Sequence, residues 1–369
     1  MMRIEGMVRR GFESVRAVFE EIVAASAGGA AFSVVRRGET LVNLWGGHAD
    51  PTTGRAWAAD TVVVLFSGTK GLAATVLADL ADRGVLAPED RVARHWPEFA
   101  AGGKQDVRVH HLLAHTAGLP YVDPVQDDLL DNRANAAALA RQTPLWTPGE
   151  RVAYHAVTFG YLLTELVRRC TGKRVGELVA ERFTGPHALD VHLGTPERVR
   201  PRLARIVREP GYRISTFLRD DPARRAIVDR MYRGLLGDGD LVNDPRYHRA
   251  ELSAGSAVGG SLSMARFYDL LATGGLVGEA ALATATSTWA QGPDVINDRP
   301  LHFGLGYELA DPIGTYGPAE VAFGHSGAGG GRHGALPEAE LGFSFTTNEM
   351  CSEDTDTRAT RLLTALPRS

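Results

Sequence analysis

The apolar residues of this chain follow helical spacing in some segments and strand spacing in others. In residues 8–26 they recur every three or four positions, which predicts an opening helix with one face on a core. Two strand-like runs follow, AAFSVVRR and TLVNLWGG, and Gly38 between them is typical of a turn. We therefore expect the chain to begin with a helix and a β-hairpin.

Helical spacing dominates the middle of the chain. Residues 68–83 and 158–171 each carry an apolar stripe, and each is followed by a glycine, Gly84 or Gly172, placed as a C-terminal cap. Strand spacing returns in AEVAFGHSG and ELGFSFTTN, and a last helix is expected over roughly 355–366. The chain thus has strands near both ends and helices between them.

This order predicts one sheet domain interrupted by a helical domain. The sheet domain would comprise residues 1–66 and 253–369, and the mainly helical domain residues 67–252. Residues 195–250 are rich in arginine and broken by Pro and Gly. Two interpretations of this variable segment stay open, a solvated insertion or a lid over a pocket.

Composition narrows the range of functions. A net charge of −4 gives no reason to expect nucleic acid or an anionic membrane as a partner. The N-terminal residues lack a signal-peptide core, and no stretch approaches the roughly 18 apolar residues of a membrane span. Two distant cysteines, Cys170 and Cys351, are expected to be reduced. We therefore expect a cytoplasmic enzyme or binding protein.

The first candidate for chemistry is Ser67 with Lys70, in VVVLFSGTKGLAATVLADLADRG. The chain has only three lysines, and this one follows a serine by three positions where an apolar extended run becomes a helix. Residues at i and i+3 share a helix face, so the amine can reach the serine hydroxyl. Apolar surroundings would lower the lysine pKa from about 10.4, and a neutral amine can accept the serine proton.

The second candidate is Tyr154. A turn at TPG delivers this tyrosine just ahead of the helix predicted over 158–171. Beside a cationic lysine the phenol would lose its proton more easily and act as a general base. The alternative is that Tyr154 only packs in the core.

The third candidate is the strand end FGHSGAGGGRHG. Its glycines do not fit a phosphate-binding loop, because the required lysine and the following helix are absent from the pattern. An edge strand that approaches substrate through its backbone fits better, with Gly327 leaving the approach open. A backbone N–H here could form an oxyanion hole with that of Ser67.

Together the three segments resemble the serine hydrolases built like class C β-lactamases and family VIII carboxylesterases, within the penicillin-binding fold. The segments HLLAHTAGLP, TPGE, GGSLSMARFYDLLA and GFSFTTN look alike too, and the resemblance covers roughly residues 10–366. It implies an α/β fold in which an antiparallel sheet flanked by helices carries an inserted all-helical domain.

The resemblance also implies roles for individual residues. Ser67 would be the nucleophile, Lys70 its activator and Tyr154 the general base, and the backbone amides of Ser67 and Ala328 would form the oxyanion hole. The positions that would contact substrate are Ala156, His325, Ser326 and Gly327.

Two departures from the lactamase pattern bear on the substrate. Where the lactamases have Tyr-x-Asn the chain has Tyr154, His155 and Ala156, and where they have Lys-Thr-Gly it has His325, Ser326 and Gly327. The missing amide and lysine charge are groups that hold a lactam's amide and carboxylate. We therefore expect a serine carboxylesterase that forms an acyl-enzyme with a small-molecule ester or acyl substrate.

Alternatives to this activity are an acyltransferase of the same fold, a β-lactamase or D,D-peptidase, and a catalytically silent penicillin-binding-like module. No cofactor is expected. His110, His111 and His115 do not converge on one helix face and lack a carboxylate at ligand spacing, so they are interpreted as packing residues rather than metal ligands. The absence of a G-x-S-x-G elbow argues against an α/β-hydrolase frame.

Overall fold

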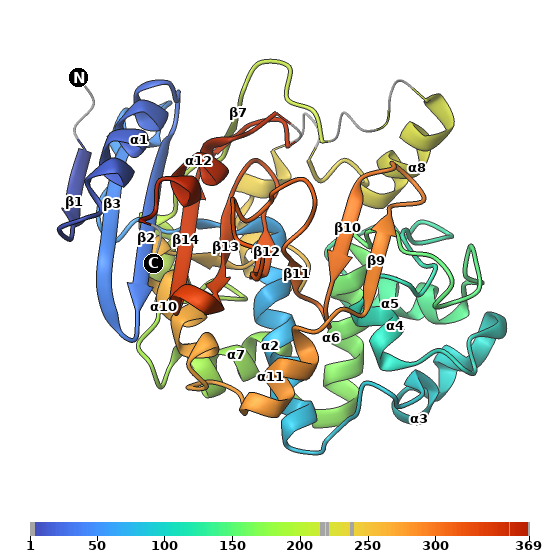
Figure 1. Cartoon of the computed structure of the whole chain (residues 1–369). Helices are drawn as coiled ribbons and strands as arrows, with labels where there is room; N and C mark the ends of the chain where they lie inside the picture. The colour runs from blue at the N-terminus through green and yellow to red at the C-terminus, as the bar shows by residue number, and fades with distance from the viewer. Residues whose placement is uncertain (1–3, 215–217, 219–220, 237–239, 354, 368–369) are drawn as a thin grey trace.

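The largest element of the fold is an antiparallel sheet (Figure 1). The computed structural model describes residues 4–214, 218, 221–236, 240–353 and 355–367. In spatial order the strands are β1 (Ile4–Val8), β3 (Glu39–Asp50), β2 (Gly29–Arg36), β14 (Leu341–Thr347), β13 (Arg332–Leu336), β12 (Phe323–Ser326), β11 (Glu308–Leu309), β10 (Pro300–Phe303) and β9 (Ala290–Pro293). The strand β4 (Arg55–Ala56) pairs with β3.

Two small sheets lie outside this one. They consist of β5 (Val63–Val64), β8 (Val258–Gly259) and β6 (Val191–His192), and of β15 (Glu349–Met350) with β7 (Val207–Arg208). The α-helices are α1 (Glu13–Ala24), α2 (Thr69–Asp82), α3 (Val92–His95), α4 (Val109–Leu113), α5 (Asn132–Arg141), α6 (Thr158–Thr171), α7 (Val175–Val179), α8 (Pro222–Tyr232), α9 (Pro245–Arg249), α10 (Ser261–Ala272), α11 (Glu279–Ala285) and α12 (Arg358–Thr364). Short turns of other helix types are η1 (Phe66–Gly68), η2 (Pro97–Gly103), η3 (Ala180–Thr184), η4 (Glu197–Arg202), η5 (Leu241–Asn243) and η6 (Pro337–Ala339).

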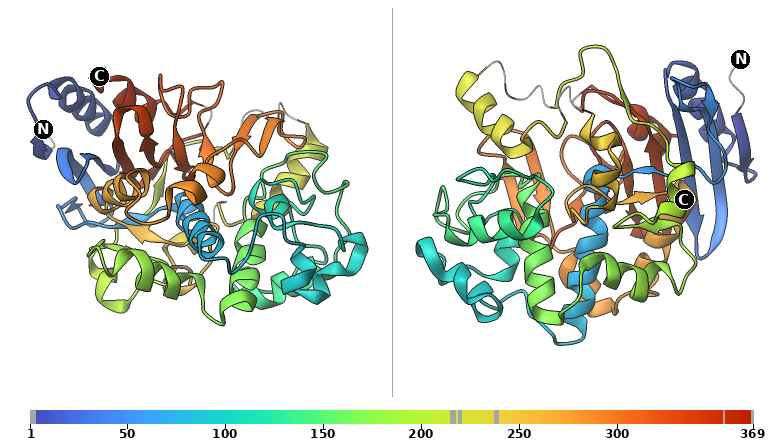
Figure 2. Two further views of the ribbon diagram at one scale, coloured as in Figure 1. Left: turned by 60° about the horizontal axis from the view of Figure 1, so that its bottom comes forward. Right: turned by 180° about the vertical axis from the view of Figure 1, so that it is seen from behind.

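Helices cover both faces of the sheet (Figure 2). Phe32 and Val34 of β2 point into a core shared with α1 and α12, whereas Ala31 belongs to the core on the other side. There α10 packs on β2, β13 and β14. Its approach to β14 is close, because a Cβ on Gly342 would lie 2.3 Å from the Ala265 carbonyl oxygen. The predicted α/β class with an antiparallel sheet is confirmed.

Several predicted elements have nearly the expected bounds. The opening helix, the hairpin of β2 and β3, the helices α2 and α6, and the strands β12 and β14 all form. Gly38 has φ of 81° in the hairpin turn, and Gly172 ends α6 with φ of 72°. The strands β1, β9, β10 and β11 were not predicted, because their short runs carry little periodic signal. No helix in the described ranges is both long and apolar enough to cross a bilayer.

Helix α2 runs through the middle of the molecule, between the sheet and the other helices (Figure 1). Its residues from Thr69 to Leu80 are all buried. Gly71 lies against the side chain of Tyr268 from α10, so that an added Cβ would be 2.1 Å from the tyrosine hydroxyl oxygen. That hydroxyl is buried and has no hydrogen-bond partner among the described residues. The close contact fixes the distance between α2 and α10.

The substitution Gly71→Ala is expected to lower the free energy of unfolding by about 1–3 kcal/mol, the usual cost of overpacking a rigid core. Tyr268→Phe removes the clashing oxygen and an unpartnered buried hydroxyl, so this single change should be nearly neutral. The double variant should recover most of the loss. Urea unfolding of all four proteins measures the effect, and a Gly71→Ala protein as stable as the wild type would contradict the contact.

Candidate active site

Ser67 lies where a buried extended segment turns into α2. The strand β5 pairs with β8, and the chain then passes through η1 before α2 begins at Thr69. Phe66 makes this turn with φ of 46°, a left-handed conformation that is unfavourable for a bulky residue. Strain of this kind occurs at functional sites, where the surrounding packing holds it. The turn places Ser67 on the wall of a cleft.

The amine of Lys70 is fully buried one helical turn after Ser67. Its Nζ atom lies 2.9 Å from Ser67 Oγ, 2.8 Å from the carbonyl oxygen of Ala156 and 2.9 Å from that of Ala254. Burial lowers the pKa of Lys70 to about 7, although the carboxylates of the cleft oppose this change. A large share of the Lys70 amine is therefore neutral near pH 7.

The three contacts of Lys70 suit the neutral form. A neutral amine has two N–H donors and one lone pair, and the two carbonyl oxygens accept both donors. The lone pair then points to the remaining neighbour, the hydroxyl of Ser67. The geometry lets Ser67 donate its proton to Lys70.

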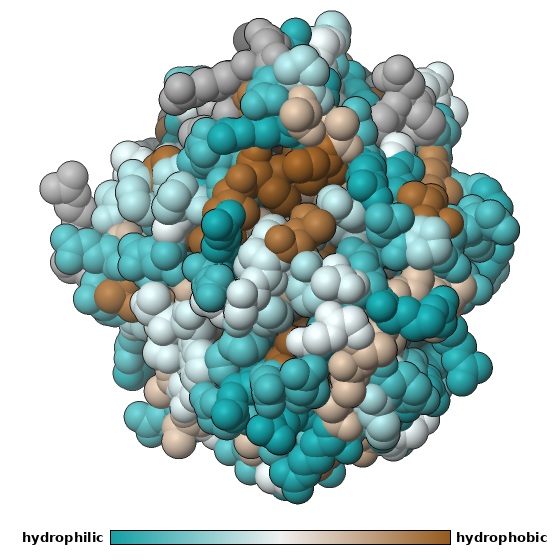
Figure 3. All heavy atoms as spheres, turned by 90° about the vertical axis from the view of Figure 1, so that its right-hand side faces the viewer, coloured by the Kyte–Doolittle hydropathy of each residue, from teal (hydrophilic) through white to brown (hydrophobic). Residues whose placement is uncertain are grey.

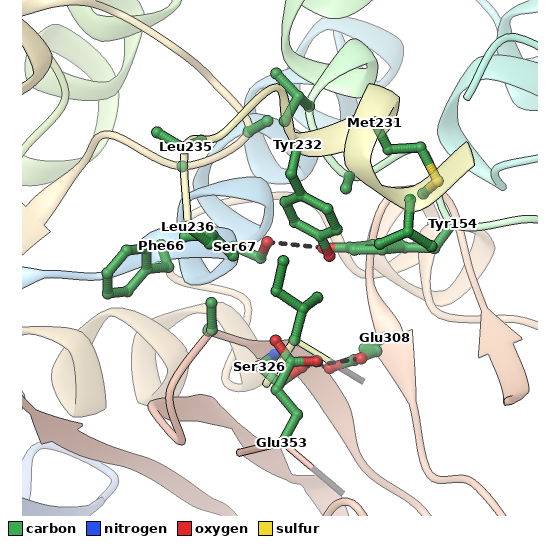
Figure 4. Close-up of a pocket in the computed structure, with 18 of the residues that line it drawn as sticks. Phe66, Ser67, Tyr154, Met231, Tyr232, Leu235, Leu236, Glu308, Ser326 and Glu353 are labelled. Atoms are coloured by element: carbon green, nitrogen blue, oxygen red, sulfur yellow. Dashed lines mark hydrogen bonds between the residues drawn. The ribbon is translucent and has the colours of Figure 1, made fainter. Parts of the chain in front are cut away.

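Tyr154 is the second neighbour of the serine oxygen. Its hydroxyl donates to Ser67 Oγ at 2.7 Å, and Lys70 Nζ lies 4.9 Å from the centre of its ring (Figure 4). Burial raises the pKa of Tyr154 far above its ordinary value near 10, and the hydrogen bond to Ser67 offsets only part of this. The expectation that Tyr154 loses its proton more easily than an ordinary tyrosine is therefore wrong. The phenol keeps its proton because it is buried, and the nearby carboxylates of Glu308 and Glu353 act in the same direction.

Two residues hold the Tyr154 loop in place. Asp294, in the loop after β9, accepts a hydrogen bond from the Tyr154 backbone N–H at 2.9 Å. Nδ1 of His115 accepts from the backbone N–H of His155 at 3.0 Å, and the His115 ring packs on Tyr154 and on Phe303. His115 thus serves in packing. Sequence reasoning missed Asp294, which lies far from Tyr154 in the sequence and has no motif around it.

The end of β12 forms the wall next to Ser67. A Cβ on Gly327 would lie 2.5 Å from the carbonyl oxygen of Leu65, so the missing side chain lets this strand approach the chain just before the serine. Ser326, Gly327 and Ala328 line the cleft. The Ala328 backbone N–H has no hydrogen-bond partner in the described part of the chain, as an oxyanion donor requires.

Of the two positions that depart from the lactamase pattern, Ala156 lines the cleft and His325 is buried behind it. Ala156 lines the cleft and gives its carbonyl oxygen to Lys70. His325 has a side chain that is 1% exposed, packs beside Tyr154, and is not among the residues lining the cleft. Burial lowers the pKa of His325 to about 4, so its ring is neutral at pH 7.

Apolar side chains form the rest of the cleft. Figure 3 shows hydrophobic atoms gathered in a hollow on the face where α8, β9 and β10 lie in Figure 1. From α8 and the residues after it come Val228, Met231, Tyr232, Leu235 and Leu236. The arginine-rich segment therefore supplies one wall of the cleft.

A buried carboxylate lies on the opposite side of this cleft. Glu308 of β11 is 7% exposed and accepts hydrogen bonds from the backbone N–H and the hydroxyl of Ser326, at 2.7 and 3.0 Å (Figure 4). Sequence reasoning missed it as well. The one available signal was a charged residue between Tyr307 and Leu309 in an otherwise apolar run.

Comparisons with known proteins agree with this geometry. The sequence model of the beta-lactamase family matches residues 15–366. The esterase/beta-lactamase LipL of Mycobacterium tuberculosis is 34% identical over 341 residues, which cover 88% of this chain and 78% of LipL.

Solved structures extend the similarity to the whole fold. A penicillin-binding protein homologue from Caulobacter crescentus has a TM-score of 0.89 at 32% identity, covering 98% of both chains. A family VIII carboxylesterase has a TM-score of 0.88 at 34% identity, covering 99% of both chains. With the family match spanning nearly its full length, the chain belongs to the beta-lactamase family.

Proposed function

We propose that the protein is a serine carboxylesterase that works through an acyl-enzyme on Ser67. The observation that carries this proposal is the buried amine of Lys70, which lies 2.9 Å from a serine hydroxyl on the wall of an apolar cleft. Relatives described as an esterase/beta-lactamase and a family VIII carboxylesterase support it. The apolar walls suit the carbon chains of a neutral ester.

Acylation would begin at the serine oxygen. Ser67 Oγ bonds to the ester carbonyl carbon as its proton moves to Lys70 Nζ, and the backbone amides of Ser67 and Ala328 hold the oxyanion. Tyr154 keeps its proton until the ester C–O bond breaks and then donates it to the departing alkoxide. The ammonium of Lys70 returns a proton to Tyr154, which is thus a proton carrier rather than a permanent base.

Deacylation would reverse these proton movements. Water attacks the acyl carbon and gives one proton to Tyr154 as Tyr154 passes its own proton to Lys70, whose ammonium then supplies the proton for the serine oxygen. The bond from the acyl carbon to Ser67 Oγ then breaks, the serine oxygen regains a proton, and the free acid leaves. The site returns to its starting protonation state with one water consumed for each ester.

A fluorophosphonate should label Ser67, because an activated hydroxyl beside oxyanion donors attacks such electrophiles. Mass spectrometry of the digested protein locates the adduct, and Ser67→Ala should abolish both labelling and ester hydrolysis. Ser256 and Ser261 are buried and serve as internal comparisons. An adduct on Ser326 would show that the wrong serine has been assigned.

The value of kcat/KM for a neutral ester should rise with pH through about 7 and then level off. The neutral amine is the base, so activity is lost as Lys70 gains a proton below its pKa of about 7. The neighbouring rings of His155 and His325, with pKa values of about 4, stay neutral over this limb.

Tyr154→Phe provides the matched control for this pH profile. The variant should lower kcat by at least about 10²-fold through loss of the proton carrier, yet keep the limb near pH 7, since Lys70 is intact. A wild-type profile that is flat between about pH 5 and pH 9, or a limb near pH 10, would mean that Lys70 is not the base.

A further inference from the structure

Several charged residues line the cleft without a part in the proposed proton transfers, and Glu308 is the one that contacts Ser326. Glu308 lines the cleft on β11, next to the β12 residues that carry the oxyanion donor. Burial alone raises the pKa of its carboxyl, but the His325 ring in its protonated form at low pH, the guanidiniums of Arg299 and Arg332 and the donors of Ser326 outweigh burial and lower the pKa to about 2. The carboxylate is therefore ionised at every pH at which the enzyme would work.

The charge of Glu308 is not cancelled by an ion pair at close range. Among the described residues, its ion-pair contact is with Nδ1 of His325 at 4.0 Å, and that ring is neutral near pH 7. Arg332 directs Nη1 to the carbonyl oxygen of Thr315, and Arg299 lies 3.7 Å from Glu353. Both guanidiniums line the same cleft and attract the Glu308 carboxylate through space, so they offset part of its negative charge, and the remainder acts on a substrate in the cleft.

The charge of Glu308 also changes the pKa values of the reacting groups Lys70 and Tyr154. Of all charged groups, Glu308 exerts the largest effect on both Lys70 and Tyr154, and in each case it favours the protonated form. The field at the reaction centre is therefore that of a nearby anion. A second anion placed beside it would be repelled, and the low dielectric of a buried site strengthens this repulsion.

Ser326 donates its only hydroxyl hydrogen to Glu308, so that hydrogen is not available to a substrate. A serine hydroxyl has a single proton, and this one is donated to Glu308. Only the lone pairs of Ser326 Oγ remain for a ligand, and they cannot bind a carboxylate. The wall beside Ser326 therefore presents a negative charge and acceptor atoms to a ligand.

We propose that Glu308 is a specificity-determining residue that excludes substrates carrying a carboxylate and admits neutral or cationic ones. The inference rests on the proposed ester hydrolysis and names the charge class of its substrates. Glu308→Gln is the informative change, because the amide keeps an acceptor for the Ser326 N–H while it removes the charge and frees the serine proton.

The test compares two isosteric substrate pairs in the wild type and Glu308→Gln. One pair is 4-nitrophenyl 4-methylpentanoate with mono-4-nitrophenyl succinate, and the other is 3,3-dimethylbutyl acetate with acetylcholine. The kcat/KM ratio of the anionic to the neutral ester should rise about tenfold or more in Glu308→Gln, and the ratio of the cationic to the neutral ester should fall. A shift in one pair alone supports the proposal and shows which end of the substrate faces Glu308.

Three control variants separate the charge from other effects. Glu308→Asp keeps the charge and should keep the anionic ester disfavoured. Glu150→Gln makes the same charge change on an exposed turn outside the cleft and should leave both ratios unchanged. Ser326→Ala keeps the Glu308 charge, so a rise in the anionic ratio equal to that of Glu308→Gln would overturn the proposal.

Two further outcomes keep this inference distinct from the proposed function. A wild type that hydrolyses the charged and the neutral member of both pairs equally well overturns the inference without any variant, and leaves the esterase proposal standing. The same holds if both ratios stay unchanged in Glu308→Gln. A wild type that hydrolyses no neutral ester contradicts the proposed function, and the inference with it.

Discussion

The burial of one amine is the constraint on which the site depends. An isolated ammonium in this environment is costly, so burial favours the neutral form of Lys70 and lowers its pKa to about 7. The carbonyl oxygens of Ala156 and Ala254 accept the two N–H donors of that neutral form. Ser67 then faces a base near neutral pH, and Tyr154 keeps its proton for a leaving group.

Close packing around the site keeps the Lys70 amine buried, and glycines make this packing possible. Among the glycines at which an added Cβ would be closer than 3 Å to a neighbouring atom, four connect the elements of the site: Gly68 against His333, Gly71 against Tyr268, Gly160 against Ala254, and Gly327 against Leu65. They bring the sheet, the helix of the nucleophile and the segment that supplies a carbonyl oxygen within reach of one another. The cleft forms between elements that pack closely because these glycines have no side chains to separate them.

The local parts of the site could be predicted from the sequence, and the long-range parts could not. Ser67, Lys70 and α2 belong to one short segment whose periodicity and residue types already indicate a base beside a hydroxyl. Asp294 and Glu308 reach the site only through strands of two to four residues, which carry little periodic signal.

The protonation of Tyr154 was predicted in the wrong direction for a related reason. Proximity to a lysine can be read from motifs, but the burial that neutralises this lysine and protonates this tyrosine is a property of the folded chain. The variable segment around α8 gave no apolar stripe as clear as that of α6, yet its apolar residues line the cleft.

Direct titration of Lys70 by NMR tests the central claim most directly. The chain has only Lys70, Lys104 and Lys173, so lysine labelled with ¹³C at Cε gives few signals, and single Lys→Arg variants assign them. The account predicts that the Lys70 signal titrates with a pKa of about 7, below the value of about 8 for Lys104, which is buried as well. A Lys70 amine that stays charged up to about pH 10 would contradict the account.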